Sequence, residues 1–295
     1  MPADRSRDAD AIARTECVLC DVAADRTHLF TKGGWNFVRC VECGLVSLSP
    51  IPSGAELIAH HEASYRTGAY AVFAAAEEIR AAIARHRLAE LEPLAPSGAW
   101  LDVGCSTGAF VAEVDRRGLT AEGVELSAEA VRQATARGLT VHHATVEGFD
   151  PPHPYAVVTA FDVVEHLPDP RSFLDRVRGW LTSDSLLALT LPDCASPLAR
   201  IMGRHWFYYT APDHVHYFTP ATIRRLLASL GYREITVRPV RKPLTLDYAV
   251  SQLGHFMPTV APLGRGGLTL LPTRWRRRPI PLPLGEMMVT ARPPH

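Results

Sequence analysis

The stretch "AWLDVGCSTGAF", residues 99–110, combines a buried strand, a glycine-rich turn and the first turn of a helix. Asp102, Gly104 and Gly108 lie at this strand-to-helix turn, where glycines allow the backbone to come close to a ligand. The spacing is neither G-x-G-x-x-G nor a P-loop with Lys-Ser/Thr. An acid at the end of the strand suits a cationic or amino-bearing ligand better than a pyrophosphate. We therefore expect a ligand loop at this turn.

On both sides of this loop, strand-like and helix-like segments alternate, which is typical of βαβ units in a parallel sheet covered on both faces. The predicted strands are Trp100–Val103, Leu119–Glu125, Leu139–His143, Tyr155–Phe161, Ser185–Leu191 and Arg233–Val240. The predicted helices are about 69–92, Thr107–Arg117, Ala128–Arg137, Pro170–Leu181 and the segment "TPATIRRLLASLG" (219–231), which Thr219 can cap.

The second strand ends in "GVELS" (123–127), which places an acid 17 positions after Gly108. In βαβ ligand sites an acid at this point accepts both ribose hydroxyls of a nucleoside, so Glu125 is the predicted ribose ligand. A glycine in a βα turn is often only a turn, but the loop and the acid together favour a nucleoside site.

These motifs resemble those of the class I S-adenosylmethionine-dependent methyltransferases, from about Leu94 to Val240. The resemblance implies a Rossmann-like α/β sheet, mostly parallel, of seven strands, whose last strand, Met287–Ala291, runs antiparallel. It places the methionine end of the cofactor at the glycine loop and adenine at "HATVEGF" (143–149). The cofactor-binding residues it implies are Asp102, Gly104, Cys105, Gly108, Glu125, Leu126, Thr145, Val146 and Phe161.

Two C-x2-C pairs, Cys17/Cys20 and Cys40/Cys43, precede this region and account for four of the six cysteines. Zn²⁺ takes four ligands in a tetrahedron, and C-x2-C is the spacing at which one turn presents two sulfurs to one ion. Since all four positions are cysteine, we expect a closed, structural Zn²⁺ site in an N-terminal zinc ribbon. Four unrelated buried cysteines or two redox pairs are the alternatives.

The stretch "FDVVEHLPDP" (161–170) ends a predicted strand in Glu165 and His166. Candidate bases for methyl transfer should lie at the carboxyl ends of the strands, beside the donor. The pattern is also similar to the acid-x-x-Glu-His of ubiquinone-pathway O-methyltransferases, which implies Mg²⁺ or Mn²⁺ at Asp162, Glu165 and His166. We prefer His166 as a base or orienting group, although a Glu that braces a loop beside a packed His is an open alternative.

A second polar and aromatic cluster is "HWFYYTAPDHVHYFT" (205–219). The N-terminal cysteine module and this loop resemble those of sugar C-methyltransferases, in which an acid–His pair works as acid and base. The resemblance makes Asp213 and His214 catalytic candidates, and we add His216. A packed aromatic lid is the structural alternative.

The bulk composition limits the function classes. Lys+Arg 31 balances Asp+Glu 31, whereas proteins that hold nucleic acid through phosphate contacts are usually more basic. No stretch has the length and apolarity of a transmembrane helix, and the charged N-terminus lacks a signal sequence, so we expect a cytoplasmic protein with no membrane insertion.

We expect four regions: a zinc ribbon in 1–50, a linker and helical cover in 51–98, the methyltransferase core in 99–240, and a Pro/Gly-rich insertion with the final strand in 241–295. The leading hypothesis is methyl transfer to a sugar or other biosynthetic small molecule on O, C or N, with His166 or the Asp213–His214 loop as base. An RNA or protein methyltransferase that reads its substrate with the ribbon, and a non-catalytic binder, are alternatives, and a homodimer is left open.

Overall fold

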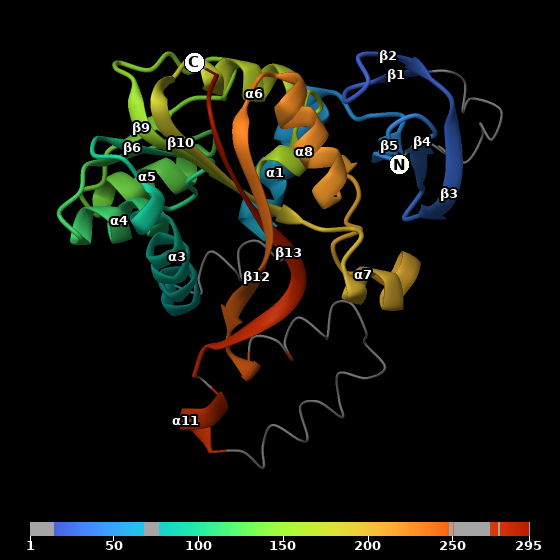
Figure 1. Cartoon of the computed structure of the whole chain (residues 1–295). Coiled ribbons are helices and arrows are strands. Elements are labelled where there is room, and N and C mark those ends of the chain that lie inside the picture. Colours follow the sequence, from blue (N-terminus) through green and yellow to red (C-terminus); the bar gives the residue numbers. More distant parts are fainter. Residues whose placement is uncertain (1–14, 68–76, 248–249, 251–271, 277, 295) are drawn as a thin grey trace.

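The computed structural model describes residues 15–67, 77–247, 250, 272–276 and 278–294. Its main sheet contains seven strands in the order β12-β13-β10-β9-β6-β7-β8 (Figure 1). Their bounds are β6 (Trp100–Val103), β7 (Ala121–Glu125), β8 (Val141–His143), β9 (Tyr155–Phe161), β10 (Leu181–Pro192), β12 (Arg233–Leu244) and β13 (Ile280–Arg292). β13 is antiparallel to both β10 and β12, whereas the pairs among β6 to β10 are parallel. The α/β fold and its antiparallel last strand are therefore confirmed.

Helices lie between the strands along the chain. They are α1 (Gly54–Thr67), α3 (Glu77–Leu91), η2 (Glu92–Leu94), α4 (Ala109–Arg116), α5 (Ala128–Ala136), η3 (Val164–His166), α6 (Pro170–Arg178), α7 (Pro197–Met202), η4 (Gly203–His205), α8 (Pro220–Ser229) and α11 (Thr273–Arg276). Side-chain caps start several of them: Ser127 before α5, Asp169 before α6 and Thr219 before α8 each accept a backbone N–H of the first turn. These caps fix where the chain leaves the loops at the strand ends.

The two faces of the sheet bury two different sets of side chains, because successive residues of a strand point to opposite faces. In β9, Val158 and Ala160 pack with α6 and α8, whereas Val157 and Phe161 pack with α3 and α4. The central strands are buried on both faces, as the continuous apolar runs in the sequence predict.

The N-terminal module forms a two-stranded sheet, β1 (Thr15–Cys17) with β2 (Val22–Ala24), and most of a four-stranded sheet. The second sheet has the order β11-β5-β4-β3 and contains β3 (Arg26–Lys32), β4 (Trp35–Cys40), β5 (Val46–Ser49) and β11 (His216–Tyr217). Its fourth strand thus comes from the aromatic loop of the core, far away in the sequence. The module also shares a hydrophobic core with the large domain, because Leu19 and Leu45 belong to the same cluster as α6 and α8.

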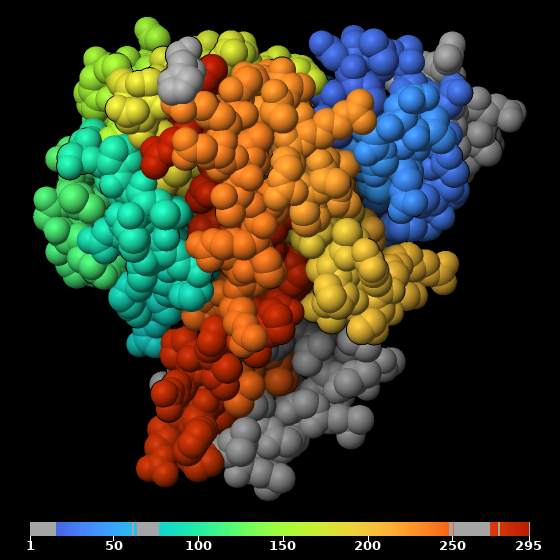
Figure 2. All heavy atoms as spheres, viewed as in Figure 1, coloured from blue at the N-terminus to red at the C-terminus, as the bar shows by residue number. Residues whose placement is uncertain are grey.

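Figure 2 shows the N-terminal module in blue against the yellow and orange segments that contain α7 and α8. Arg225 of α8 donates to the backbone carbonyl of Glu42 at 3.5 Å, and Lys32 donates to the carbonyl of Trp206 at 3.5 Å. These contacts place the module on the side of the core where α8 and the aromatic loop lie.

Several predicted elements differ in extent from those observed. The helix expected over about 69–92 is present as α3, and its first residues lie outside the described part of the chain. β10, β12 and β13 are 12 to 13 residues long. β12 and β13 also extend together beyond the rest of the sheet, where they pair down to Leu244 and Ile280. In the described ranges, no helix is both long and apolar enough to cross a bilayer.

Candidate active site

The glycine loop between β6 and α4 has the backbone conformation that the sequence predicts. Gly104 and Gly108 have φ of +71° and +76°, in the left-handed region. A Cβ at Gly104 would lie 2.6 Å from Cγ2 of Val163, and one at Gly108 would lie 2.5 Å from Cδ1 of Leu139. Glycine is therefore required at both positions for backbone conformation and for space.

Asp102 lies at the end of β6 and is almost completely buried. Its carboxylate accepts a hydrogen bond of 2.6 Å from the hydroxyl of Thr159 on β9. Burial raises the pKa of Asp102 to about 7, since the loss of hydration outweighs the Thr159 hydrogen bond and the attraction of Arg87. A cationic group bound here would favour the ionised form.

Glu125 at the end of β7 connects the two loops that would surround a nucleoside. One carboxylate oxygen accepts the backbone N–H of Ser106 at 2.9 Å, and the other accepts that of Ser127 at 2.8 Å. Burial raises the pKa of Glu125 despite these two bonds. Each carboxylate oxygen keeps a second lone pair, so the group can still accept ribose hydroxyls.

The remaining predicted cofactor residues lie around the same strand ends. The backbone carbonyl of Leu126 accepts from His143 at 3.0 Å, and the Thr145 hydroxyl accepts the N–H of Gly148 at 3.1 Å, in the turn that also contains Val146. Thr145 is thus committed to the turn, and its side-chain contact with adenine stays a prediction.

Cys105 and Phe161 were also predicted to bind the cofactor, but their side chains are buried in the core. The sulfur of Cys105 fills the space beside Gly123, where a Cβ would come within 2.4 Å of it. The Phe161 ring packs edge-on against Phe110 at 4.9 Å, and Arg87 lies 4.3 Å from its centre. Both side chains therefore pack in the core, and their contact with a cofactor stays a prediction.

Glu165, His166 and His214 lie together at the carboxyl end of the sheet. One ligand atom of each lies within 4.8 Å of the other two. The first two belong to η3, directly after β9, and His214 comes from the aromatic loop before β11. The sequence predicts each of the three as a candidate, but the fold alone brings His214 to the other two.

The hydrogen bonds of the two imidazoles determine their tautomers. Nδ1 of His166 donates to the carbonyl of Asp213 at 2.7 Å, and Nδ1 of His214 donates to the carbonyl of Tyr208 at 2.9 Å. A carbonyl can only accept, so Nδ1 carries the proton and Nε2 of each neutral ring has the free lone pair. Burial lowers the pKa of His166 and brings that of His214 to about 3, which keeps both rings neutral.

Glu165 is 1% exposed, and neither of its carboxylate oxygens has a hydrogen-bond partner in the described part of the chain. Burial, and then the nearby negative charge of Asp162, raises its pKa well above the usual value. A buried acid of this kind is either protonated or compensated by a cation or hydrogen-bond donor that binds beside it.

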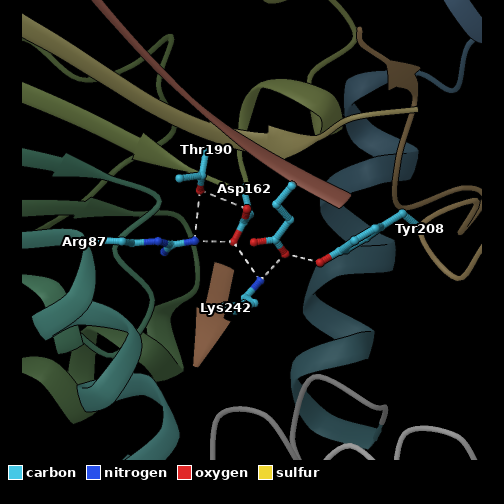
Figure 3. A network of polar contacts seen from close by, with 6 residues as sticks. Arg87, Asp162, Thr190, Tyr208 and Lys242 are labelled. Carbon is cyan, nitrogen blue, oxygen red and sulfur yellow. Dashed lines mark hydrogen bonds and ion pairs between the residues drawn. The ribbon is translucent and has the colours of Figure 1, made fainter. Parts of the chain in front are cut away.

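A network of buried charges lies next to this group (Figure 3). Asp162 accepts from Arg87 of α3 at 2.8 Å and from Thr190 of β10 at 3.0 Å, and Lys242 of β12 lies 3.5 Å from it. Lys242 also pairs with Glu286 of β13 at 2.6 Å. Burial would raise the pKa of Asp162, but Lys242 and Arg87 outweigh it and hold that pKa well below its usual range.

This network corrects the predicted metal set of Asp162, Glu165 and His166. The Asp162 carboxylate is already neutralised by two cations, Arg87 and Lys242. The backbone of Asp162 has a φ of +57°, in the left-handed region, so the chain leaves the extended conformation of β9 at this residue. The group that could hold a metal ion consists of Glu165, His166 and His214.

Two further catalytic candidates do not join this group. The Asp213 side chain points to α1, where its carboxylate pairs with His60 at 2.9 Å, and only its backbone carbonyl reaches His166. Both ring nitrogens of buried His216 are engaged, Nδ1 with the Ser47 hydroxyl at 2.8 Å and Nε2 with the carbonyl of Pro168 at 3.1 Å. His216 has no free nitrogen for proton transfer, so its predicted catalytic role is not supported.

The sequence did not single out Arg87, Thr190, Lys242 or Glu286, and it noted Tyr208 only as one aromatic residue of the loop. Tyr208 donates to Glu286, which is 2% exposed in its side chain. Charged residues in the middle of helix and strand segments carry no local signal of a buried partner. The strand 233–244 gives one weak indication of a buried ion pair, because polar and apolar residues alternate along it. A lysine that faces inward from such a strand needs an acidic partner.

The four paired cysteines come together, with all four sulfurs within 4.8 Å of one another. The Sγ atoms of Cys17 and Cys43 are 3.6 Å apart, and those of Cys20 and Cys40 are 3.8 Å apart. Thiolates at about 2.3 Å from a tetrahedral Zn²⁺ are about 3.8 Å from one another, so the arrangement fits Zn²⁺. All four are free of disulfides.

Comparison with known proteins agrees with this geometry. The family described as methyltransferase domain matches residues 75–237, more than half of the chain. The chain belongs to this family and is an S-adenosylmethionine-dependent methyltransferase. The glycine loop, Glu125 and five strands of the seven-stranded sheet, β6 to β10, lie within the matched region.

Curated relatives include ubiquinone biosynthesis O-methyltransferases. The protein of that name from Psychrobacter arcticus is 26% identical over 169 residues, which cover 52% of this chain and 66% of the relative. One from Haemophilus ducreyi is 31% identical over 132 residues, 40% of this chain and 56% of the relative. The chain thus spans less than two thirds of the length of both relatives.

Among solved structures, a SAM-dependent methyltransferase from Archaeoglobus fulgidus has a TM-score of 0.50 and 19% identity. The match covers 76% of this chain and 99% of that one. At this level of identity the likeness concerns the fold.

Proposed function

We propose that this enzyme transfers a methyl group to a hydroxyl oxygen of a small biosynthetic metabolite, with Nε2 of His166 or His214 as the proton acceptor. The observation that carries the proposal is the pair of neutral imidazoles, each held through Nδ1 by a backbone carbonyl. The names of the relatives, O-methyltransferases of ubiquinone biosynthesis, support oxygen as the acceptor atom.

In the proposed reaction the acceptor oxygen attacks the methyl carbon in line with the bond from carbon to sulfur. That bond breaks and its electrons go to sulfur, so the products are a methyl ether and the neutral thioether. The hydroxyl proton passes to Nε2 of His166 or His214 and later to solvent. Since the sulfonium is already activated, the protein's task is to align the oxygen and to remove its proton.

Glu165 has a separate role in this scheme. Its buried carboxyl group lies beside both rings without a hydrogen bond and can accept one from the acceptor or an imidazolium. Asp213 contributes its carbonyl, which fixes the ring of His166, and not its carboxylate.

A divalent metal ion is a second way to activate a hydroxyl. Glu165, His166 and His214 would hold it, with Nε2 of each ring as the ligand and Nδ1 anchored by a carbonyl, an arrangement that is common around metal-bound histidines. Bound there, the ion would lower the pKa of the acceptor hydroxyl.

Isotope-labelled S-adenosylmethionine incubated with a metabolite extract tests the activity, and identification of the labelled product gives the acceptor. Glu165→Gln separates the two mechanisms, because chelators would also remove metal from the cysteines. If the proton mechanism holds, the variant keeps measurable turnover and the same metal content as the wild type. Complete loss of turnover, together with loss of one metal ion per chain, would establish the metal mechanism instead.

A further inference from the structure

The four-stranded sheet joins the cysteine module to the loop that carries His214. β11 pairs antiparallel with β5, with His216 opposite Ser47 and Tyr217 opposite Val46. Two residues of this strand thus extend a sheet whose other three strands all come from the module. The module is therefore connected directly, through main-chain pairing, to the loop that carries His214.

Val215 connects the module to the turn that holds Glu165. Its carbonyl accepts the N–H of Leu48 on β5 at 2.9 Å, and its N–H donates to the carbonyl of Glu165 at 2.8 Å. Val215 is fully buried, so these backbone bonds have no competition from water. A displacement of β5 would therefore be transmitted to the residues on both sides of Val215.

His216 makes the same connection through its side chain. Its Nε2–H donates to the carbonyl of Pro168, just after η3, and its Nδ1 accepts from the hydroxyl of Ser47 on β5. The neutral tautomer satisfies both bonds at once, and burial keeps the ring neutral by lowering its pKa to about 4. This ring ties the module to the turn after His166.

Aromatic packing supports the other side of His214. The hydroxyl of Tyr217 donates to the backbone carbonyl of His214 at 2.8 Å. The Tyr217 ring lies 5.3 Å from Phe37 of β4 and 4.9 Å from Tyr209. One face of the catalytic loop thus packs on the module's own aromatic core.

The position of β5 depends in turn on the cysteines. Cys40 is the last residue of β4, and the turn through Cys43 leads to β5. Within it, the N–H of Cys40 donates to the carbonyl of Leu45 at 2.9 Å, and the N–H of Gly44 donates to that of Cys40 at 2.9 Å. A short turn with two metal ligands is stable only when the metal holds the thiolates together.

We propose that metal bound by the four cysteines supports the catalytic loop, and that Ser47 and His216 are positioning residues that act through His214 and Glu165. The module is then part of the active-site architecture and not a separate substrate reader. The claim about catalysis rests on the proposed function of the Glu165–His166–His214 group; the claim about the mechanical connection does not.

Hydrogen exchange on the full-length protein, with S-adenosylhomocysteine bound, tests the connection without any acceptor. In Cys40→Ser, which removes one ligand of the cysteine-bound metal and leaves the Glu165–His166–His214 group unchanged, we expect the amides of Val215 and Leu48 to lose protection by at least about tenfold. The amide of Gly104, which bonds to the carbonyl of Val124, should keep its protection. Unchanged exchange at Val215, or loss of protection at all three amides together, would overturn the proposal.

Two matched variants test the positioning role. His216→Gln replaces the rigid ring that bonds to Ser47 and Pro168 at once with a flexible amide whose oxygen and nitrogen share one carbon. His28→Gln makes the same change on the exposed far-edge strand β3 of the same sheet. We expect His216→Gln to lower kcat by about 10- to 100-fold, with the S-adenosylhomocysteine Kd within about threefold of wild type. His28→Gln should leave both unchanged.

Ser47→Ala provides a milder variant that removes only the hydroxyl, and it should lower kcat by a smaller factor with faster exchange at Val215. Wild-type kcat in both His216→Gln and Ser47→Ala would refute the positioning role. Full turnover in both His166→Ala and His214→Ala would refute the proposed base and would leave the exchange result intact.

Discussion

The rings of His166 and His214 meet edge to face, with their centres 4.6 Å apart and their planes at 83°. Residues 48 positions apart in the sequence thus present two neutral imidazoles to one space. Because each ring is fixed by a carbonyl at Nδ1, neither can turn its protonated nitrogen toward the acceptor without breaking that bond.

Removal of the two imidazoles should therefore have non-additive effects on turnover. We expect His166→Ala and His214→Ala each to lower kcat by about 10²- to 10⁴-fold, the usual range for a lost acid or base. The double variant should have a kcat only slightly below that of the less active single variant, because both rings take part in the transfer of the same proton. Affinity for S-adenosylhomocysteine should be unchanged; multiplicative losses would mean independent roles.

The glycine loop gives a prediction on cofactor binding. Gly104→Ala adds a Cβ that meets Val163 in the loop, so we expect at least tenfold weaker binding of S-adenosylhomocysteine by calorimetry. Gly118→Ala is the matched control, because Gly118 also has a positive φ, +75°, and has open space around its Cβ. Both variants should lose about 1–2 kcal/mol of stability to the left-handed backbone. Gly104→Ala should lose more because its Cβ also meets Val163, and the control should bind normally.

Asp102 should make cofactor binding depend on pH. Its pKa of about 7 in the free protein means that it must lose a proton to pair with the ammonium of the ligand. Affinity should therefore rise with pH and level off above about 7, and fall about tenfold for each unit below it. Asp102→Asn should flatten this profile and bind weakly throughout, whereas Glu129→Gln on the exposed face of α5 should keep the wild-type profile.

The buried charge network should make a large contribution to stability as a unit. Lys242→Met leaves Glu286 with Tyr208 as its neighbour and without a cation, whereas Asp162 keeps Arg87. We expect a loss of about 3–5 kcal/mol in urea denaturation. Lys242→Met/Glu286→Leu should recover most of that loss; a double variant as unstable as the single one would contradict this explanation.

The cysteine site predicts one Zn²⁺ per chain that depends on the four paired cysteines. Cys40→Ser should abolish stoichiometric zinc in protein purified without chelator, as measured by atomic emission. Cys194→Ser should keep it, because Cys194 lies outside the sulfur cluster and its thiol donates to the carbonyl of Tyr217. Zinc retained in the first variant would rule out the four-sulfur site.

The sequence was sufficient for the features that depend on neighbouring residues. The alternation of strands and helices follows from hydrophobic periodicity, and the glycines at 104 and 108 follow from a left-handed backbone that glycine adopts most readily. Glu125 lies at the strand end where the sequence places it, and its contact with ribose stays a prediction. The C-x2-C spacing is likewise local, since one turn presents two sulfurs. For these features the physical cause acts over a few residues.

The pairing of buried charges could not be predicted in this way. The resemblance to ubiquinone-pathway O-methyltransferases implied a metal at Asp162, as the second choice after His166 as a base. The folded chain instead pairs Asp162 with Arg87 from a helix before the sheet and with Lys242 from a strand near the end. Many basic residues could neutralise a given acid, and the sequence does not say which of them is buried beside it. Only the order of strands in the sheet decides that.

The different roles of His214 and His216 were likewise decided by tertiary structure. His214 and His216 are two residues apart and look equivalent in the sequence, but only His216 belongs to β11, whereas His214 precedes it in the aromatic loop. One ring points to Glu165 and His166, and the other points to Ser47 of the cysteine module. The sequence determined that polar side chains gather at the carboxyl ends of the strands. The packing of the cysteine module against the core decided which histidines have a ring nitrogen free to react. A ring nitrogen that is already bonded to a buried carbonyl or hydroxyl cannot accept a proton.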